Sequence, residues 1–135
     1  MDLLDTMHIS ASGMKAQSSR LKVVSQNIAN AEAVGSTNGK QPYRRQTITF
    51  RNELDRATGA TMVNVDKVGV DQSDFDKRYE PTNPYADAQG YVLYPNVNPI
   101  MEMMDMREAR RGYEANMNVI ESSKSMLTQT IGLLR

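Results

Sequence analysis

The last third of the chain, residues 99–135, reads PIMEMMDMREARRGYEANMNVIESSKSMLTQTIGLLR. Large apolar side chains recur in it at every seventh position: Met106, Tyr113, Ile120, Leu127 and Leu134. A second apolar row stands three residues before members of the first: Met103, Met117 and Ile131. This 3–4 spacing is typical of a narrow apolar seam along one long helix. The stretch therefore predicts a helix that needs a partner surface along its length.

The start of this helix carries a clear signal. Asn98 is a good N-cap, and Pro99 suits the first helical position because its missing N–H leaves no bond unmade there. Inside the helix, Gly112 either weakens it or allows another helix to come close. The second row is imperfect, since Arg110 and Lys124 also fall in it.

The first 34 residues show the same spacing. Their large row is Met7, Met14, Leu21 and Ile28. The row three residues earlier is Leu4, Ala11, Ser18 and Ser25. Because this second row shrinks to Ala and Ser, it lets another backbone approach closely. We expect a helix from Leu3 to about Val34, stopped by Gly35. The two end helices then pair with each other, with copies of themselves, or both.

The middle of the chain has a different character. It contains Gly, Pro and short runs of β-branched and aromatic residues, which favour strands joined by turns. The strands expected are 43–50, 62–70 and 91–94, and an acidic loop is expected over 71–76. The fold class predicted is α+β, with long terminal helices pairing as a coiled-coil-like region around a small β-rich insertion. The segments predicted are an N-terminal helix (1–34), a β-rich middle region (35–98) and a C-terminal helix (99–135).

Composition excludes several functions. Sixteen basic and sixteen acidic residues cancel, so the chain shows no basic character for binding nucleic acid or an acidic membrane. It contains no Cys, which rules out disulfides and thiolate chemistry. The N-terminus does not resemble a cleaved secretory signal, and no stretch is apolar enough to span a membrane.

No motif predicts catalysis, a cofactor or a metal. Residues 35–40 resemble a phosphate-binding loop only superficially, because the glycine spacing is short and Gln41 replaces the required Ser or Thr. The aspartates at 71, 74 and 76 lack the central Gly and final Glu of a calcium loop. His8 is the only histidine and has no second ligand or nucleophile in a recognisable pattern.

Two stretches carry a family resemblance. Ser25, Gln26, Asn27, Ile28, Ala29 and Asn30, followed by Ala31, closely resemble the N-terminal signature of bacterial flagellar rod and hook proteins. Arg111-Gly112 followed by Tyr113, Glu114, Ala115 and Asn116 resembles their C-terminal signature. Pro42-Tyr43-Arg44-Arg45, Tyr79-Glu80-Pro81 and Gly90-Tyr91-Val92 also match the basal-body rod proteins of this family in order and spacing. The resemblance covers essentially the whole chain.

The resemblance implies a structural protein of the bacterial flagellum, active in motility and without enzymatic activity. Such proteins build the proximal rod, the part of the drive shaft that crosses the periplasm, by helical assembly. They leave the cell through the flagellar type III export apparatus without a cleaved signal. The implied partners are other copies of the chain and the rod proteins FlgB, FlgF, FlgG and FliE, with no nucleic acid, no small-molecule substrate and no membrane insertion.

The residues expected at the assembly interface are therefore those of the seams. They are Leu4, Met7, Met14, Leu21, Ile28, Met106, Tyr113, Met117, Ile120, Leu127, Ile131 and Leu134. A rival hypothesis is a monomeric binding module, in which a helical hairpin presents its β insertion to a small ligand. A rod subunit associates through the seams, whereas the module stays monomeric and binds through the middle.

Overall fold

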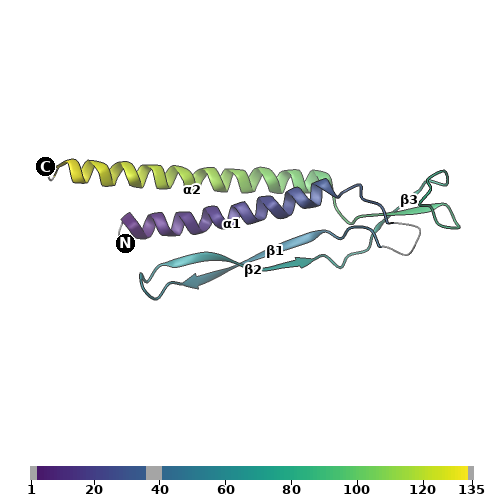
Figure 1. Ribbon diagram of the computed structural model, residues 1–135, viewed down its shortest axis with the longest axis horizontal. Coiled ribbons are helices and arrows are strands. Elements are labelled where there is room, and N and C mark those ends of the chain that lie inside the picture. The colour runs from purple at the N-terminus through teal and green to yellow at the C-terminus, as the bar shows by residue number, and fades with distance from the viewer. Residues whose placement is uncertain (1–2, 36–40, 134–135) are drawn as a thin grey trace. The chain divides into compact units, whose positions relative to one another are not determined.

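A computed structural model describes residues 3–35 and 41–133 (Figure 1). The elements in chain order are α1 (Leu3–Ala29), β1 (Gln46–Leu54), β2 (Thr61–Val70), β3 (Asp76–Tyr79), β4 (Tyr91–Tyr94) and α2 (Pro99–Leu133). Two long helices thus flank a small β region, which confirms the α+β prediction. Leu134 of the expected seam and most of the loop at 35–40 lie outside the described residues.

The chain divides into two compact units, which are taken in turn. The helix–hairpin unit comprises Met1–Leu21, Ile48–Lys67 and Arg107–Arg135. The β3–β4 unit comprises Lys22–Thr47 and Val68–Met106. Each unit therefore contains part of both helices and part of the strand pair β1–β2.

The helix α2 begins as expected. The Oδ1 atom of Asn98 accepts hydrogen bonds from the main-chain N–H groups of Ile100 and Met101, at 3.1 and 3.4 Å. These bonds satisfy donors that a helix start leaves without partners. Asn98 is therefore the N-cap and Pro99 the first helical residue.

The helix α1 ends earlier than the expected Val34. Its last residue is Ala29, and a turn follows. The Nδ2 atom of Asn30 donates a hydrogen bond to the main-chain oxygen of Gln26 at 2.8 Å. An Asn side chain that bonds the nearby main chain offers an alternative to continued helix. The stop therefore comes from Asn30 rather than from Gly35.

Within the helix–hairpin unit, the two helices run antiparallel and approach each other closely. A Cβ added to Gly13 would stand 2.8 Å from Nδ2 of Asn116, and one added to Gly112 would stand 3.2 Å from the side chain of Gln17. One turn further on, Arg20 forms an ion pair with Glu108 at 3.6 Å. The glycine at 112 thus serves the close approach that the sequence allowed.

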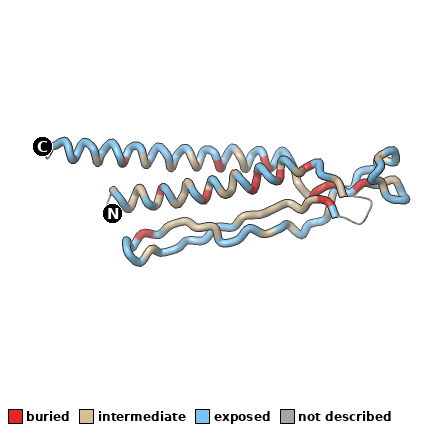
Figure 2. The backbone as a smooth tube through the Cα atoms, in the orientation of Figure 1, coloured by how far each residue is buried: buried red, intermediate tan, exposed pale blue. Residues whose placement is uncertain are grey.

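The residues buried deepest in this helix pair are small. They are Ser10 and Ala16 on α1, with Ala109 and Ser123 on α2 (Figure 2). Ser10, Ala109 and Ser123 stand three residues after Met7, Met106 and Ile120. The second row, which stands three residues before the large row, is exposed and takes no part in this contact within the subunit. Small side chains allow the closer approach, which is why the helices pair on that side.

The hairpin of β1 and β2 packs against α1 in the same unit. The main-chain N–H of Val63 donates to the hydroxyl of Ser12 at 3.2 Å. The second strand matches its prediction within one residue, but the first was expected at 43–50 and spans Gln46–Leu54. Arg45, just before β1, accepts a main-chain hydrogen bond from Asp71 at 2.8 Å, but its own N–H donates to the side chain of Asn96. At the other end, Asp55 donates to the main-chain oxygen of Ala60 at 2.9 Å, so main-chain pairing continues past Leu54.

The β3–β4 unit contains a strand that the sequence did not predict. The four residues of β3 are exposed and mostly charged, so no apolar alternation marks them. The strand is nevertheless paired antiparallel with β4, from Asp76 opposite Tyr94 to Tyr79 opposite Tyr91. Val92 and Tyr94 of β4 are buried. Gly90 precedes β4 with a positive φ of 82°, a conformation that side chains disfavour.

Burial along α2 leads to a prediction about its far end. From residue 124 to 133 only Leu127 is partly buried, and all the others are exposed. A helix end without packing partners is marginally stable in water. In the isolated subunit we expect amides of 124–133 to exchange with solvent about tenfold faster or more than those of 102–110. Hydrogen–deuterium exchange measured by mass spectrometry tests this, and equal protection of the two segments would contradict it.

Candidate functional site

The β3–β4 unit is organised around the fully buried side chain of Asn27. Its Nδ2 atom donates hydrogen bonds to the main-chain oxygen of Gln46 at 2.9 Å and to Oε2 of Glu102 at 3.1 Å. Its Oδ1 atom accepts bonds from the hydroxyl of Tyr43 at 2.9 Å and from the N–H of Gln46 at 2.8 Å. An amide has two donors and two acceptor sites, and all four are used here. Asn27 thus ties the end of α1 to α2 and to the start of β1.

The second centre of this cluster is Glu102, in the first turn of α2. Its side chain is 1% exposed, and its Oε1 atom accepts a hydrogen bond from Nε of Arg45 at 2.5 Å. The same guanidinium lies 3.9 Å from carboxylate oxygens of Asp71 and Asp105. One arginine therefore faces three carboxylates, of which only Glu102 is buried. A buried charge of this kind requires its partner, because desolvation penalises an unpaired carboxylate.

The surrounding groups hold this geometry. Burial and the nearby negative charge of Glu102 raise the pKa of Tyr43, so its hydroxyl keeps the proton that it donates to Asn27. Asn96 accepts a bond from the N–H of Arg45 at 2.8 Å through Oδ1 and donates through Nδ2 to the main-chain oxygen of Asp71 at 3.2 Å. The loop at 71–75 is thereby fastened to residues 44 and 45.

Main-chain and side-chain hydrogen bonds from Ser73, aided by Arg45 and Arg44, lower the pKa of Asp71. The guanidinium of Arg44 lies 4.3 Å from the ring centroid of Phe75, a cation–π contact. The acidic stretch that could have suggested calcium is thus an ordered part of the fold. Across residues 3–35 and 41–133, no group of three His, Asp or Glu side chains is arranged so that it could hold a metal ion.

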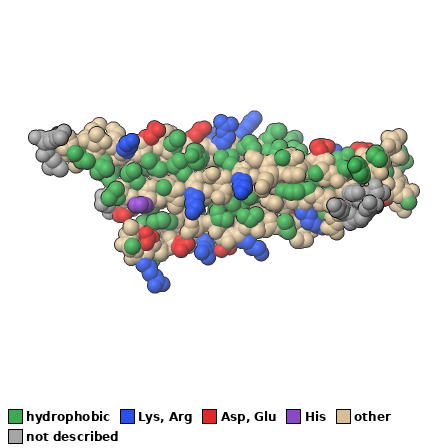
Figure 3. Space-filling model, viewed as in Figure 1, with side chains coloured by type: hydrophobic (Ala, Val, Ile, Leu, Met, Phe, Trp, Pro, Cys, Tyr) green, Lys and Arg blue, Asp and Glu red, His purple; other side chains and the backbone are tan. Residues whose placement is uncertain are grey.

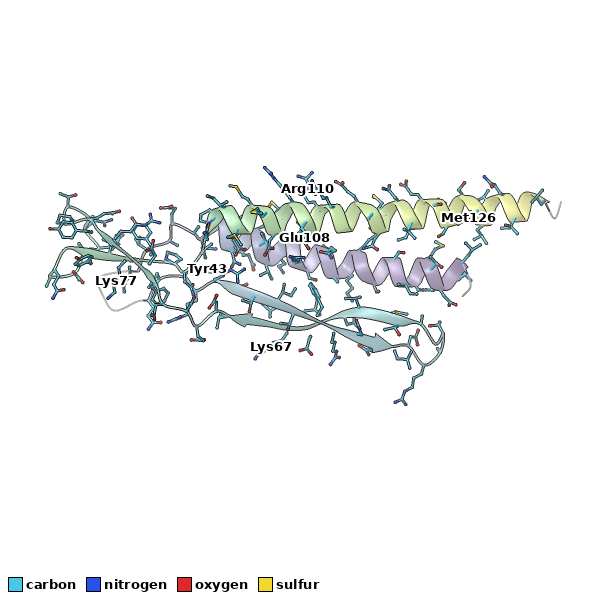
Figure 4. The ribbon with its side chains drawn as sticks, turned by 180° about the vertical axis from the view of Figure 1, so that it is seen from behind. Tyr43, Lys67, Lys77, Glu108, Arg110 and Met126 are labelled. Atoms are coloured by element: carbon cyan, nitrogen blue, oxygen red, sulfur yellow. The ribbon has the colours of Figure 1, made fainter. Side chains whose placement is uncertain are left out.

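The seam residues occupy two kinds of position. The large rows are partly buried on both helices: Met7, Met14, Leu21, Ile28, Met106, Tyr113, Ile120 and Leu127. Leu4, Met117 and Ile131 are exposed, with 52%, 42% and 58% of their surface accessible. Other large apolar side chains of α2 are exposed as well, including Val119 and Met126, and Figure 3 shows hydrophobic side chains along this helix. Figure 4 shows Arg110 projecting from α2 on the side away from α1.

The two signature motifs have separate locations. Asn27 belongs to the buried cluster, while Ser25, Gln26 and Ala29 are exposed and Ile28 and Asn30 are partly buried. In the second motif, Tyr113 and Asn116 are partly buried, whereas Glu114 and Ala115 are exposed. Asn116 Nδ2 donates to the main-chain oxygen of Gly112 at 2.9 Å, beside the contact with Gly13. The motifs therefore support two different helix contacts, one in each unit.

Sequence reasoning did not single out Glu102, Arg45 or Tyr43 as a group. Arg45 and Tyr43 stood in the quoted motif at 42–45, and Glu102 is acidic in a first helical turn, where the helix dipole favours it. Nothing in their spacing indicates that a helix and a loop bring them together. The signal that could have pointed to Glu102 is an acidic residue on a helix face that is otherwise apolar.

The polar groups of this cluster are paired with one another, which joins the end of α1 to the first turn of α2. In the described part of the chain, neither helix is long and apolar enough to cross a membrane. The helices also carry exposed large apolar side chains, most of them on α2.

Comparisons with known proteins agree with this description. The family described as "Flagella basal body rod protein" matches residues 7–35, which contain the Asn27 motif. The family described as "Flagellar basal body rod FlgEFG protein C-terminal" matches residues 88–133, which contain α2. Both matched segments place the chain in the class of flagellar rod proteins.

Curated relatives extend the match to nearly the whole chain. The flagellar basal-body rod protein FlgC of Agrobacterium fabrum is 51% identical over 127 residues, covering 94% of this chain and 91% of the relative. FlgC of Salmonella typhimurium is 41% identical, with 98% of each covered, and FlgC of Bacillus subtilis is 34% identical, with 97% of each covered. The chain belongs to the flagellar basal-body rod protein FlgC family. It is a structural rod subunit of the flagellar basal body, where it assembles with other rod components.

Proposed function

We propose that this subunit builds the proximal rod, the drive shaft that crosses the periplasm, by helical self-assembly with other rod proteins. The segments 1–34 and 99–135 form the axial core, and the middle region at 35–98 lies outward. The subunit has no enzymatic activity. It reaches its site through the type III export apparatus without a cleaved signal.

The observation that carries this proposal is the set of exposed large apolar side chains on α2. Met117 and Ile131 lie on one side of the helix, and Met126 is exposed on another. Exposed apolar surface of this extent is a sign of an interaction site. Methionine suits such a surface, because its flexible thioether adapts to different neighbours. Neighbouring rod subunits would cover these side chains in the assembled rod.

The partners proposed are other copies of this chain and the rod proteins FlgB, FlgF, FlgG and FliE. A rod subunit in a stack of different proteins meets like copies beside it and unlike ones above and below. The adaptable Met-rich side of α2 is suited to both. The family match supports assembly with rod components, and the choice of these four follows from the family resemblance of the sequence.

Photo-cross-linking in motile cells tests the proposal. A photoreactive amino acid at Met117, which is exposed and on the expected seam, should give cross-links to another copy or to one of the four rod proteins. The matched control is Asn118, which is also exposed but points about 100° further round the helix. Mass spectrometry of products from purified basal bodies identifies the partners.

A missing cross-link at position 117 would contradict the proposal. If position 117 gives no cross-link in fully motile cells while the probe is shown to be present, α2 is not covered by rod neighbours. A protein that also stays monomeric at high concentration would then fit the rival binding module. Similar cross-links from positions 117 and 118 would mean that the helix has no preferred interaction side.

A further inference from the structure

The β3–β4 unit contains an open cleft of about 680 Å³ that the helix contacts do not involve. Its aromatic lining consists of Tyr79, Tyr85 and Tyr94, with Glu32 and Glu80 among the other lining residues. Tyr79 and Tyr85 are 65% and 46% exposed, which is unusual for such large rings. Exposed tyrosines of this kind are enriched at protein interfaces, because they offer area with little loss of conformational freedom.

The charge of the cleft is acidic. Among the described residues, its lining includes no Lys or Arg. Arg78 lies nearby, with its guanidinium carbon 4.2 Å from the ring centroid of Tyr94, but its Nε atom donates to Asp76 at 3.1 Å. That stacked arginine shows that a ring of this cleft accepts a guanidinium on its face. Two carboxylates and exposed ring faces together fit a further arginine from outside.

The helix–hairpin unit presents an arginine with the matching properties. Arg56 stands in the loop between β1 and β2, and its side chain has no ion pair or hydrogen bond to any described residue. The loop is exposed from residue 56 to 59 and is held by Asp55. Oδ1 of Asp55 accepts from the N–H of Ala57 at 2.9 Å, and its main-chain oxygen accepts from Gly59 at 2.8 Å. A loop fixed in advance loses little freedom on docking.

We propose that the hairpin loop of one copy docks into the β3–β4 cleft of a second copy, with Arg56 against the tyrosine rings and the carboxylates of Glu32 and Glu80. The contact joins two different surfaces of the same chain. Such a heterologous contact does not close a dimer and instead propagates around a helical or ring assembly. This inference rests on the proposed helical self-assembly, but it concerns a contact separate from the α2 seam.

The absence of Cys from the chain permits a clean cross-linking test. One tagged copy carries Ala57→Cys beside the loop arginine, and a second, differently tagged copy carries Thr82→Cys in the cleft. Both positions are exposed. Co-produced in cells lacking the natural gene and treated with a mild oxidant, they should form a disulfide between the two tags in basal bodies. Replacing Thr82→Cys with Gln129→Cys, at an exposed position on α2, gives the control pair and should not cross-link.

Charge reversal tests the arginine itself. Arg56→Glu and Glu32→Arg each should lower the yield of cross-linked pairs about tenfold, and the two changes combined should restore much of it. Arg56→Lys should be intermediate, because lysine keeps the charge but stacks less well. A normal yield with Arg56→Glu would overturn the role of the arginine.

Absence of the Ala57–Thr82 cross-link in assembled basal bodies would overturn the docking. If position 117 still cross-links in those basal bodies, the helical assembly stands and only this contact is removed. If neither cross-link forms, both proposals fail together.

Discussion

Arg45→Met is expected to destabilise the subunit by about 3 kcal/mol, more than any single surface change. The substitution leaves the 1%-exposed carboxylate of Glu102 without the guanidinium that donates to it. Asp71 and Asp105 remain on the same side, so the buried charge also keeps like charges near it. Removing one partner of a buried ion pair costs about 3–5 kcal/mol, and the lower figure applies because Arg45 is 29% exposed. Urea denaturation followed by circular dichroism measures the loss.

The double variant separates a lost contact from a stranded charge. With Glu102→Gln added, the side chain still accepts from Asn27 but no longer carries a charge. The pair Arg45→Met/Glu102→Gln should therefore be clearly more stable than Arg45→Met alone. Arg51→Met provides the matched control, because Arg51 pairs with the exposed carboxylates of Glu53 and Asp66 and should change stability by less than about 1 kcal/mol. A similar small loss for Arg45→Met would show that the cluster does not depend on the charge pair.

The helices were predictable because their signals are local or periodic. Asn98 and Pro99 marked the start of α2 through residues adjacent in sequence, and that start is where it was expected. The partly buried rows followed from a seven-residue repeat. The sequence did not predict the side on which the helices meet, because Ala109 and Ser123 are too small to stand out in a hydrophobic pattern. Whether two helices can pack closely depends on the side chains of both. Small residues therefore predict a close contact only when both helices are considered together.

The buried cluster was less predictable for a different reason. Asn27 was found through its motif, but its four bonds reach residues up to 75 positions away. Polar residues that satisfy one another look like ordinary surface residues in a sequence. The strand β3 shows the same limit, because its exposed charged residues carry no strand signal and it forms only through pairing with β4. Long-range pairing therefore accounts for most of what the sequence did not indicate.

Leu127→Glu is expected to stop rod growth while leaving export intact. Leu127 is partly buried near the far end of α2, where most neighbouring residues are exposed. If rod neighbours complete its burial, the change removes about 2 kcal/mol of apolar stabilisation and strands a carboxylate whose desolvation costs several kcal/mol more. The interface recurs in every copy, so the defect recurs at each step of growth. Gln129→Glu, two residues away and exposed, should cost under about 0.5 kcal/mol and give normal rods.

Counting basal bodies by electron microscopy compares the two strains, with immunoblots confirming equal production and export of both variants. The far end of α2 makes few contacts within the subunit, so the isolated Leu127→Glu protein should keep nearly the same denaturation midpoint as the parent. A loss of rods with an unchanged subunit therefore locates the effect in assembly. A large loss of subunit stability would instead assign Leu127 to the intrachain helix contact. Equal numbers of complete rods from both variants would mean that the exposed side of α2 is not where neighbouring subunits pack.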